Sequence, residues 1–373
     1  MKKIRILHVG LSSNLGGIEK YLFNMFENIN HEIFEMDYLV FKGKKVCFYD
    51  EIIKKANIYE ITHRNKNYRL FLSDLKKFFI NSNYDYIHFH LMEFSCFERI
   101  VLAYKYTNAK IILHSHIANH KLSTIKTRIL NFIGEKIILR NDDNYLKVAC
   151  SESAGKYMFE KFKNNKFIVL NNGINVQEFV YDSEKRKNIR NKLKINDSFV
   201  IGNIGRMVQQ KNHTFLMEIF KNVLKEDSKS KLLLIGNGKL KSKIIEKAKS
   251  LDILKNIIFI DNTSDIQAYL SAMDIFVFPS LFEGLGIVLI EAQASGLNCL
   301  VTDSLPIEID ISDNLKRIAL NKNPDEWAKN ILLIKNEKVD RKKINDIVKK
   351  SNFDIKKSIK ILESYYISNM GEM

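Results

Sequence analysis

The chain has 373 residues, too many for one ordinary hydrophobic core, so its length predicts two domains. Hydrophobic residues make up 46% and aromatic residues 11%, and no apolar run is long enough to span a bilayer, which excludes a disordered chain and a membrane-spanning one. The net charge of +16 suits nucleic acid, an anionic membrane surface or a phosphorylated substrate, and is equally expected from compositional drift of a genome.

Both the N-terminal segment and the cysteines predict a cytoplasmic protein. Residues 1–10 are basic and then apolar, but the apolar part is too short for a signal peptide and is predicted as a first buried strand. The cysteines have neither metal-ligand nor disulfide-framework spacing; they are Cys47, Cys96, Cys150 and Cys299.

Short β-branched runs alternate with segments of helical periodicity, as in parallel βαβ units. In the first half we predict strands over 4–10, 33–41, 58–61, 86–90, 110–114, 148–151 and 167–171, and helices including 17–28, 69–81 and 97–106. A second series of strands is predicted over 199–204, 231–235, 257–260, 274–278 and 298–302. The two series predict an α/β protein with two Rossmann-like, doubly wound domains, each with its ligand crevice at the carboxyl ends of the strands.

The boundary between the domains is predicted at the polar, glycine-containing hinge Asn171–Asn175. We therefore expect an N-terminal domain over 1–170 and a C-terminal domain over 171–352, which the charged segment 182–194 opens. The last segment repeats apolar residues at helical spacing, and we predict a helix within 353–373 that packs back on the first domain.

The most informative segment covers 276–292, where a buried strand leads through a glycine-containing loop into a helix predicted to begin near Ile287 and to end before Gly296. The first N–H groups of such a helix have no intrahelical partner and suit a diphosphate. Glu283 lies in the loop and Glu291 one turn into the helix. Since carboxylates repel phosphates, we expect them to bind sugar and ribose hydroxyls. The alternative is that Glu283 caps the helix and Glu291 is a solvated residue.

A second cluster follows the first strand of the C-terminal domain. Gly205 permits a tight turn, and Arg206 and Lys211 supply cations at the carboxyl end of that strand. Together with a helix N-terminus, they would neutralise a nucleoside diphosphate as it leaves. The alternative is that both side chains are merely solvated.

In the N-terminal domain, Gly16 and Gly17 precede a helix that is expected to begin near Ile18, so their backbone could approach a phosphate or an acceptor. They are no dinucleotide fingerprint, because G-x-G-x-x-G is missing. Asp37, taken as the end of the second strand, is therefore only a weak candidate for binding ribose.

Histidines lie at the predicted ends of two strands of this domain: His88, His90, His114 and His116. Together they indicate a site, with structural histidines as the alternative. Neither metal-ligand spacing nor a D-x-D pair of carboxylates accompanies them, so no metal ion is predicted.

Residues 121–140 form a basic segment whose apolar residues recur at helical spacing: Leu122, Ile125, Ile129, Phe132 and Ile133. One interpretation is a surface that docks on anionic lipid to reach a lipid-linked acceptor. The other is an ordinary amphipathic helix packed on the first sheet.

With these features, the chain resembles the retaining glycosyltransferases of family four, whose GT-B architecture has two Rossmann-like domains facing a cleft. The resemblance covers nearly the full length. It rests on Gly16-Gly17, the hinge Asn171–Asn175, Gly205-Arg206 with Lys211, Gly236-Asn237-Gly238, and the E-x7-E signature from Glu283 to Glu291.

The resemblance implies roles for these residues. Glu283 would contact the donor sugar and Glu291 the ribose, while His114, or His116 as second candidate, would lie beside the reacting sugar. The implied catalytic residues are His114, His116 and Glu283, and the implied donor-binding residues are Gly16, Gly17, Arg206, Lys211, Glu283, Gly284, Leu285, Gly286, Ile287, Val288 and Glu291.

The implied activity is transfer of a hexose-type sugar, with retention, from a nucleotide sugar to a glycan or lipid-linked acceptor in bacterial surface polysaccharide biosynthesis. A UDP-sugar is the commonest donor of such proteins. The chemistry is a front-face displacement that needs neither a metal ion nor another cofactor, and the two glutamates are not the carboxylate pair of a hydrolase.

Three rival functions are weighed against this activity. A nucleotide-sugar epimerase of the same fold stays open as the alternative, because a fold does not fix a function. A phosphorylase would need a lysine for pyridoxal phosphate, and no convincing lysine is seen. A nucleic-acid partner is not expected, because the lysines are spread and no binding motif occurs.

Overall fold

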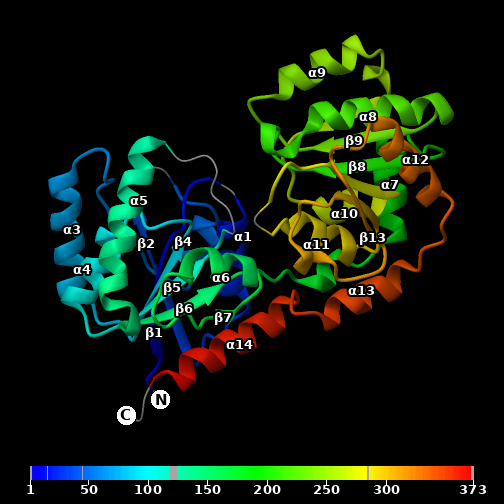
Figure 1. The fold of residues 1–373 in the computed structure, drawn as a ribbon. Coiled ribbons are helices and arrows are strands. Elements are labelled where there is room, and N and C mark those ends of the chain that lie inside the picture. The colour runs from blue at the N-terminus through cyan, green and yellow to red at the C-terminus, as the bar shows by residue number, and fades with distance from the viewer. Residues whose placement is uncertain (1, 15, 44, 118–123, 284, 371–373) are drawn as a thin grey trace. The chain divides into compact units, whose positions relative to one another are not determined.

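The computed structural model describes residues 2–14, 16–43, 45–117, 124–283 and 285–370, and Figure 1 shows their fold. The chain divides into two compact units, one made of the residues up to 173 together with those from 355 onward, and the other of residues 174–354. The chain therefore changes unit after Gly173 and again after Asp354. Gly173 lies within Asn171–Asn175, the hinge predicted from the sequence, and the predicted domains met at residues 170 and 171.

The first unit contains a parallel sheet with the strand order β3-β2-β1-β4-β5-β6-β7. Its strands are β1 Ile4–Val9, β2 Phe34–Phe41, β3 Ile58–Ile61, β4 Tyr86–Leu91, β5 Lys110–Ser115, β6 Tyr145–Ala149 and β7 Ile168–Val169. Its α-helices are α1 Gly17–Asn28, α2 Tyr49–Ile52, α3 Tyr68–Ile80, α4 Glu98–Tyr106, α5 Ile125–Ile138, α6 Glu152–Phe159 and α14 Ile355–Ser368.

Alternate residues of these strands face two separate cores, because successive side chains of a strand point to opposite faces. One core contains Leu7, Ile87 and residues of α3, α4 and α6. The other contains Ile6, Tyr86 and residues of α1 and α14. The C-terminal helix thus closes one face of the first sheet. Gly173 permits this packing, since a Cβ there would lie 2.8 Å from the Cα of Ile355.

The second unit contains a parallel sheet with the order β10-β9-β8-β11-β12-β13. Its strands are β8 Val200–Ile204, β9 Lys231–Ile235, β10 Ile257–Ile260, β11 Ile275–Phe278, β12 Asn298–Thr302 and β13 Leu315–Ile318. Its α-helices are α7 Ser183–Leu193, α8 His213–Glu226, α9 Lys241–Ser250, α10 Ile266–Ala272, α11 Ile287–Ala294, α12 Pro324–Lys335 and α13 Arg341–Lys350. Helices α8, α9 and α12 pack on one face of this sheet, and α7, α10 and α11 on the other.

The predicted fold class is confirmed, since both units are doubly wound parallel α/β sheets. Two strand predictions were wrong. The strand predicted at 148–151 begins at Tyr145, and β13 was missed. Every residue of β13 is only partly buried and two are charged, so this edge strand has no apolar run to reveal it.

Two global features complete the fold. Within the described residues, no helix combines the length and the apolar character that crossing a bilayer requires. The cysteines Cys47, Cys96, Cys150 and Cys299 all carry free thiols.

Candidate functional site

The strand order of the second unit brings the two predicted clusters together. Strands β8 and β11 are neighbours at the point where the order reverses, and there the connections leave to opposite faces of the sheet. The loop after β8 carries Gly205, Arg206 and Lys211, and the loop after β11 carries Glu283. Both loops therefore border the crevice at the carboxyl ends of the strands, where α/β sheets bind ligands.

An ion pair joins the two loops. The Nζ of Lys211 lies 2.7 Å from Oε1 of Glu283, and the two side chains are only 12% and 8% exposed. The same Nζ lies 4.6 Å from the ring centroid of Phe278, within range of a cation–π interaction. Lys211 is therefore not a solvated surface lysine.

Backbone contacts fix the distance between the loops. The N–H of Leu281 donates to the carbonyl of Gln210 at 2.8 Å, and the side-chain amide of Gln210 donates to the carbonyl of Phe282 at 2.9 Å. Below them, Gly236 has a φ of +134°, and a Cβ there would lie 2.2 Å from the carbonyl oxygen of Gly205. Only glycine fits at position 236, so the β9 loop can support the Arg206 loop from beneath.

The N-terminus of α11 has no side-chain cap among the described residues. Its N-cap is Gly286, with a φ of 77°. Glu283 therefore does not cap it. The N–H groups of Ile287 and Val288 lie in the first turn, where the helix dipole favours anions.

The remaining predicted donor-site residues differ in exposure. Arg206 is exposed, whereas Leu285 is 5% exposed and packs in the core of the unit. Glu291 is 4% exposed, so it is not a solvated helix residue. Gly284 lies outside the described residues.

In the first unit, the predicted histidines form one stack together with His8, which the sequence analysis missed. His8 of β1, His88 and His90 of β4, and His114 of β5 lie on the face that α1 and α14 cover, and His116 follows directly. Nδ1 of His8 lies 3.0 Å from Nε2 of His90, whose Nδ1 lies 2.9 Å from Nε2 of His116. A second line joins Nε2 of His88 to Nδ1 of His114 at 3.1 Å.

Burial keeps these imidazoles neutral. Desolvation lowers the pKa of His8 and of His116 to about 3. The pKa values of His88, His90 and His114 are also well below the ordinary value, first because of burial and then because of neighbouring histidines. Each ring therefore carries one proton, which can serve one hydrogen bond as donor.

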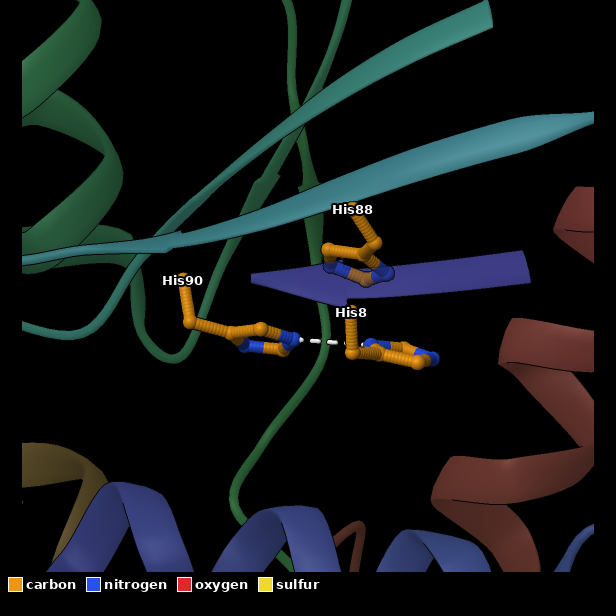
Figure 2. A group of neighbouring side chains, drawn as sticks. All are labelled: His8, His88 and His90. Atoms are coloured by element: carbon orange, nitrogen blue, oxygen red, sulfur yellow. Dashed lines mark hydrogen bonds between the residues drawn. The ribbon is translucent and has the colours of Figure 1, made fainter. Parts of the chain in front are cut away.

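Proximity alone would let two triplets of this stack hold a metal ion, His8, His88 and His90 (Figure 2) and His90, His114 and His116. The ring planes oppose it. Figure 2 shows His88 lying over His8, and the rings of His88 and His90 are stacked at 12°. In the second triplet the rings of His114 and His116 are stacked at 27°. Because imidazole lone pairs lie in the ring plane, stacked rings do not direct them at one point. The arrangement is that of hydrogen-bonded neutral imidazoles.

The interpretation of Asp37 as a ribose ligand was wrong. Asp37 lies inside β2 and is fully buried. Its carboxylate accepts hydrogen bonds from the N–H of Asn57 at 2.8 Å and from the hydroxyl of Tyr84 at 2.8 Å. It is a structural residue that ties β2 to the following loop and to the segment before β4.

Gly16 is the N-cap of α1, as predicted for the start of that helix, but a carboxylate lies beside it. A Cβ at Gly16 would lie 3.0 Å from Oε2 of Glu19, and Oε1 of Glu19 accepts a hydrogen bond from Ser12 at 2.5 Å. A carboxylate at this helix N-terminus disfavours a phosphate and suits a hydroxyl donor.

Other polar residues at the site were missed because each is single in its segment. His213 at the start of α8 is 3% exposed, and burial, with the charge of Lys211 second, lowers its pKa to about 4. Ser280 and Asn203 are fully buried, and within the described residues neither Oγ of Ser280 nor Oδ1 of Asn203 has a hydrogen-bond partner. Only His8 had a usable signal, since it ends an apolar run as His90 and His114 do.

A pocket of about 880 Å³ lies at the opposite, amino-terminal edge of the second sheet. Arg186, Arg190 and Arg341 line it, and their guanidinium groups donate to carbonyls at the end of α10. These arginines cap a helix C-terminus, so the pocket is structural.

Comparison with known sequences connects this geometry to a family. Residues 185–351 match the family described as glycosyl transferases group 1. EpsF of Bacillus subtilis (strain 168), itself named only as a candidate glycosyltransferase, is 27% identical over 336 residues that cover 88% of this chain and 86% of EpsF. The capsular polysaccharide biosynthesis glycosyltransferase CapH of Staphylococcus aureus is 26% identical, with 98% of this chain and 99% of CapH covered.

A further relative and two solved structures agree. The UDP-Gal:alpha-D-GlcNAc-diphosphoundecaprenol alpha-1,3-galactosyltransferase of Escherichia coli is 24% identical over 81% of this chain and 80% of its own. HepE of Anabaena in complex with UDP superposes with a TM-score of 0.80 at 14% identity, covering 98% of this chain and 100% of HepE. A glycosyltransferase from Rickettsia africae has a TM-score of 0.79 at 18% identity, with 100% of both chains covered.

The structural matches establish the fold, and the sequence matches relate the chain to glycosyltransferases. Residues 185–351 are a domain of the glycosyl transferases group 1 family, in a chain that has the two-domain GT-B fold and resembles bacterial capsular and exopolysaccharide glycosyltransferases.

Proposed function

We propose that the protein transfers a hexose-type sugar, with retention, from a UDP-sugar to a glycan or lipid-linked acceptor in bacterial surface polysaccharide biosynthesis. The observation that carries the proposal is the meeting of the Lys211 loop, the Glu283 loop and the uncapped α11 N-terminus at the switch point of the second sheet. This crevice offers cations and N–H donors for a diphosphate and a carboxylate for hydroxyls.

Relatives support the choice of substrates. The Escherichia coli relative is named for a UDP-galactose donor and a diphosphoundecaprenol-linked acceptor, and CapH for capsular polysaccharide. HepE has been crystallised with UDP-glucose. The relatives named above are glycosyltransferases, so the epimerase alternative gains no support.

In the proposed complex, Arg206 and Lys211 bind the diphosphate together with the first N–H groups of α11. Glu283 accepts hydrogen bonds from the donor sugar, and Glu291 from the ribose. In this proposal no metal ion takes part, because Arg206, Lys211 and the N–H groups of α11 stabilise the diphosphate charge. We therefore expect transfer to persist in EDTA.

Retention follows if the acceptor hydroxyl attacks the anomeric carbon from the side on which UDP leaves. The new carbon–oxygen bond forms as the bond to the β-phosphate oxygen breaks, that oxygen keeps the bonding electrons, and it takes the proton of the hydroxyl. Arg206, Lys211 and the α11 N-terminus stabilise the developing phosphate charge. His114 and His116 lie beside the reacting sugar in this proposal. The carboxylate of Glu19 leads us to assign Gly16 and Gly17 to the acceptor rather than to donor phosphate.

The test is UDP release from UDP-glucose, UDP-galactose and UDP-N-acetylglucosamine, with thermal shift on UDP, GDP, ADP and NAD. We expect a response to UDP that Arg206→Ala removes. Ligand at about a hundred times Kd stabilises by about 2.7 kcal/mol, a shift that is easily measured. A response to NAD alone would refute the proposal.

We also propose that α5 docks on the anionic inner face of the cell membrane, where a lipid-linked acceptor would be reached. The helix packs inward through Gly134 and Ile138, while its apolar residues face outward. Ile125, Ile129, Phe132 and Ile133 are 77%, 55%, 55% and 42% exposed. The alternative interpretation of this segment requires these residues to pack on the first sheet, and their exposure contradicts it. Leu122 lies outside the described residues.

Basic side chains surround this apolar face. Lys126, Arg128, Lys136 and Arg140 are exposed, and Nζ of Lys136 lies 4.5 Å from the ring centroid of Phe132. Cations around inserted apolar residues suit an interfacial helix on anionic lipid, at about 1 kcal/mol for each basic residue.

Co-sedimentation with vesicles tests the docking. We expect binding to vesicles of phosphatidylglycerol and phosphatidylcholine that Ile129→Ser and Arg128→Glu weaken. Leu333→Ser is the matched control, since Leu333 is a 67% exposed residue of α12 in the other unit. Equal binding to pure phosphatidylcholine vesicles would contradict an electrostatic contribution.

A further inference from the structure

The histidine stack is connected to the C-terminal helix by one hydroxyl group. The phenol oxygen of Tyr366 in α14 lies 2.7 Å from Nδ1 of His88, and Nε2 of His88 lies 3.1 Å from Nδ1 of His114. All three side chains are fully buried. They form a line from the helix, through β4, to the end of β5.

The direction of the hydrogen bonds along this line follows from counting donors. In one arrangement Tyr366 donates to Nδ1 of His88, His88 donates from Nε2 to His114, and the Nε2–H of His114 alone has no partner among the residues that the structure describes. In the reverse arrangement the phenol O–H and Nε2 of His114 both lack partners. Because each unpaired buried polar group costs about 1–3 kcal/mol, the first arrangement is favoured.

The other line of the stack has no hydroxyl at its end. It runs from His8 through His90 to His116; among the described residues Nε2 of His8 has no partner, and the imidazole of His116 interacts with the side-chain amide of Asn172. Because an amide offers both a donor and an acceptor, Asn172 can serve either direction of that line. Tyr366 is therefore what gives the His88–His114 line a defined direction.

We propose that Tyr366 is a positioning residue that, through His88, holds His114 as the tautomer protonated on Nε2. His114 then offers a hydrogen-bond donor at the carboxyl end of β5, and it cannot accept a proton as a general base. This inference rests on the proposed function for its consequence, because His114 is the histidine assigned to the reacting sugar. His114 then takes no proton from the acceptor hydroxyl, which agrees with the proposed transfer of that proton to the leaving phosphate.

The first experiment reads the tautomers directly, by long-range ¹H–¹⁵N correlation on the full chain labelled with ¹⁵N-histidine. His88→Gln and His114→Gln assign the signals. We expect both rings protonated on Nε2, and a mixture of tautomers in Tyr366→Phe. His114 protonated on Nδ1, or no change in Tyr366→Phe, would overturn the inference. This readout does not depend on any substrate, so it stands even if no sugar transfer is found.

The second experiment tests the catalytic consequence. Tyr86→Phe is the matched control, because the hydroxyl of Tyr86 is also buried and donates to the backbone carbonyl of Tyr366 at 2.5 Å, without touching a histidine. Loss of the defined tautomer should lower kcat in Tyr366→Phe by about fivefold with little change in donor KM, the equivalent of one net hydrogen bond. Tyr86→Phe should leave kcat unchanged, and His88 and His114 should both stay protonated on Nε2. Equal kcat in the two variants would overturn the positioning role.

Discussion

The ion pair of Lys211 and Glu283 predicts opposite responses to two substitutions. Lys211→Met keeps the aliphatic stem, which passes 3.2 Å from the position of a Cβ on Gly205, but removes the charge. Glu283→Gln keeps the size of the side chain but removes the carboxylate. In the structure the ammonium is held by Glu283, so an incoming diphosphate must compete with that carboxylate for it.

The size of each effect follows from burial. With the side chains 12% and 8% exposed, water screens the pair little, and a hydrogen bond to a charged group contributes about 1.5–3 kcal/mol. Lys211→Met should therefore weaken UDP binding by about 10- to 150-fold. Glu283→Gln should leave UDP binding unchanged or tighten it by up to about tenfold, since the competitor is gone. Sugar transfer should nevertheless fall in Glu283→Gln, because the carboxylate that accepts from the sugar hydroxyls is lost.

Calorimetric titration of UDP into the wild type, both single variants and the double variant measures these effects. Lys335→Met is the control, because the ammonium of Lys335 also lies 2.7 Å from a carboxylate, that of Asp227. This pair lies at the amino-terminal edge of the second sheet, opposite the crevice. Lys335→Met should not change the Kd of UDP. If Glu283→Gln weakens UDP binding as much as Lys211→Met does, Glu283 supports the diphosphate site and the competition argument is refuted.

Three further predictions address a glycine beneath the site and two buried polar features of the first unit. Gly236→Ala should lower the melting temperature in a thermal-shift assay and weaken UDP binding, since its Cβ would lie 2.2 Å from a carbonyl oxygen. Gly205→Ala should lower the melting temperature less, because its Cβ would meet only the flexible side-chain carbons of Lys211, the nearest at 3.2 Å. Asp37→Asn should destabilise the protein by about 1–3 kcal/mol in urea unfolding and leave the Kd of UDP unchanged. Burial lowers the pKa of His8 and His116 from 6.5 to about 3, so below pH 6.5 only the unfolded chain is protonated there. Stability is then full above pH 6.5 and falls toward pH 3, by about 2 kcal/mol for each histidine between pH 7 and pH 5. In urea unfolding, His116→Gln should remove its share of that slope.

Local pattern was enough to predict the elements but not their neighbours. The run 231–235 was predicted as a strand with the bounds that β9 has, because it is apolar and continuous. The helix start at Ile287 was also correct, because glycines and then a helix-forming run mark it. Strand β13 was missed, because an edge strand packs on one side only and needs fewer apolar residues.

The site was predictable as two clusters and not as one arrangement. Residues at the carboxyl ends of parallel strands share an edge of the sheet, and this rule placed Lys211 and Glu283 on the same side. Their pairing depends on β8 lying next to β11, a contact across 72 positions of sequence. The spacing of residues within either loop does not indicate that β8 and β11 are neighbours. The interpretation of Asp37 failed for the same reason, since its partner Tyr84 lies on a later segment.

The histidine stack shows the same limit at greater sequence separation. Tyr366 belongs to a helix whose period was interpreted as core packing, and that interpretation is correct, since the side chain is fully buried. Its hydroxyl nevertheless meets His88 across 278 positions of sequence. Periodicity records which face of a helix is buried, but a buried tyrosine also needs a partner for its hydroxyl, and only the tertiary fold supplies it. An aromatic residue on a core face is therefore a candidate for a polar role wherever the facing strands carry histidines.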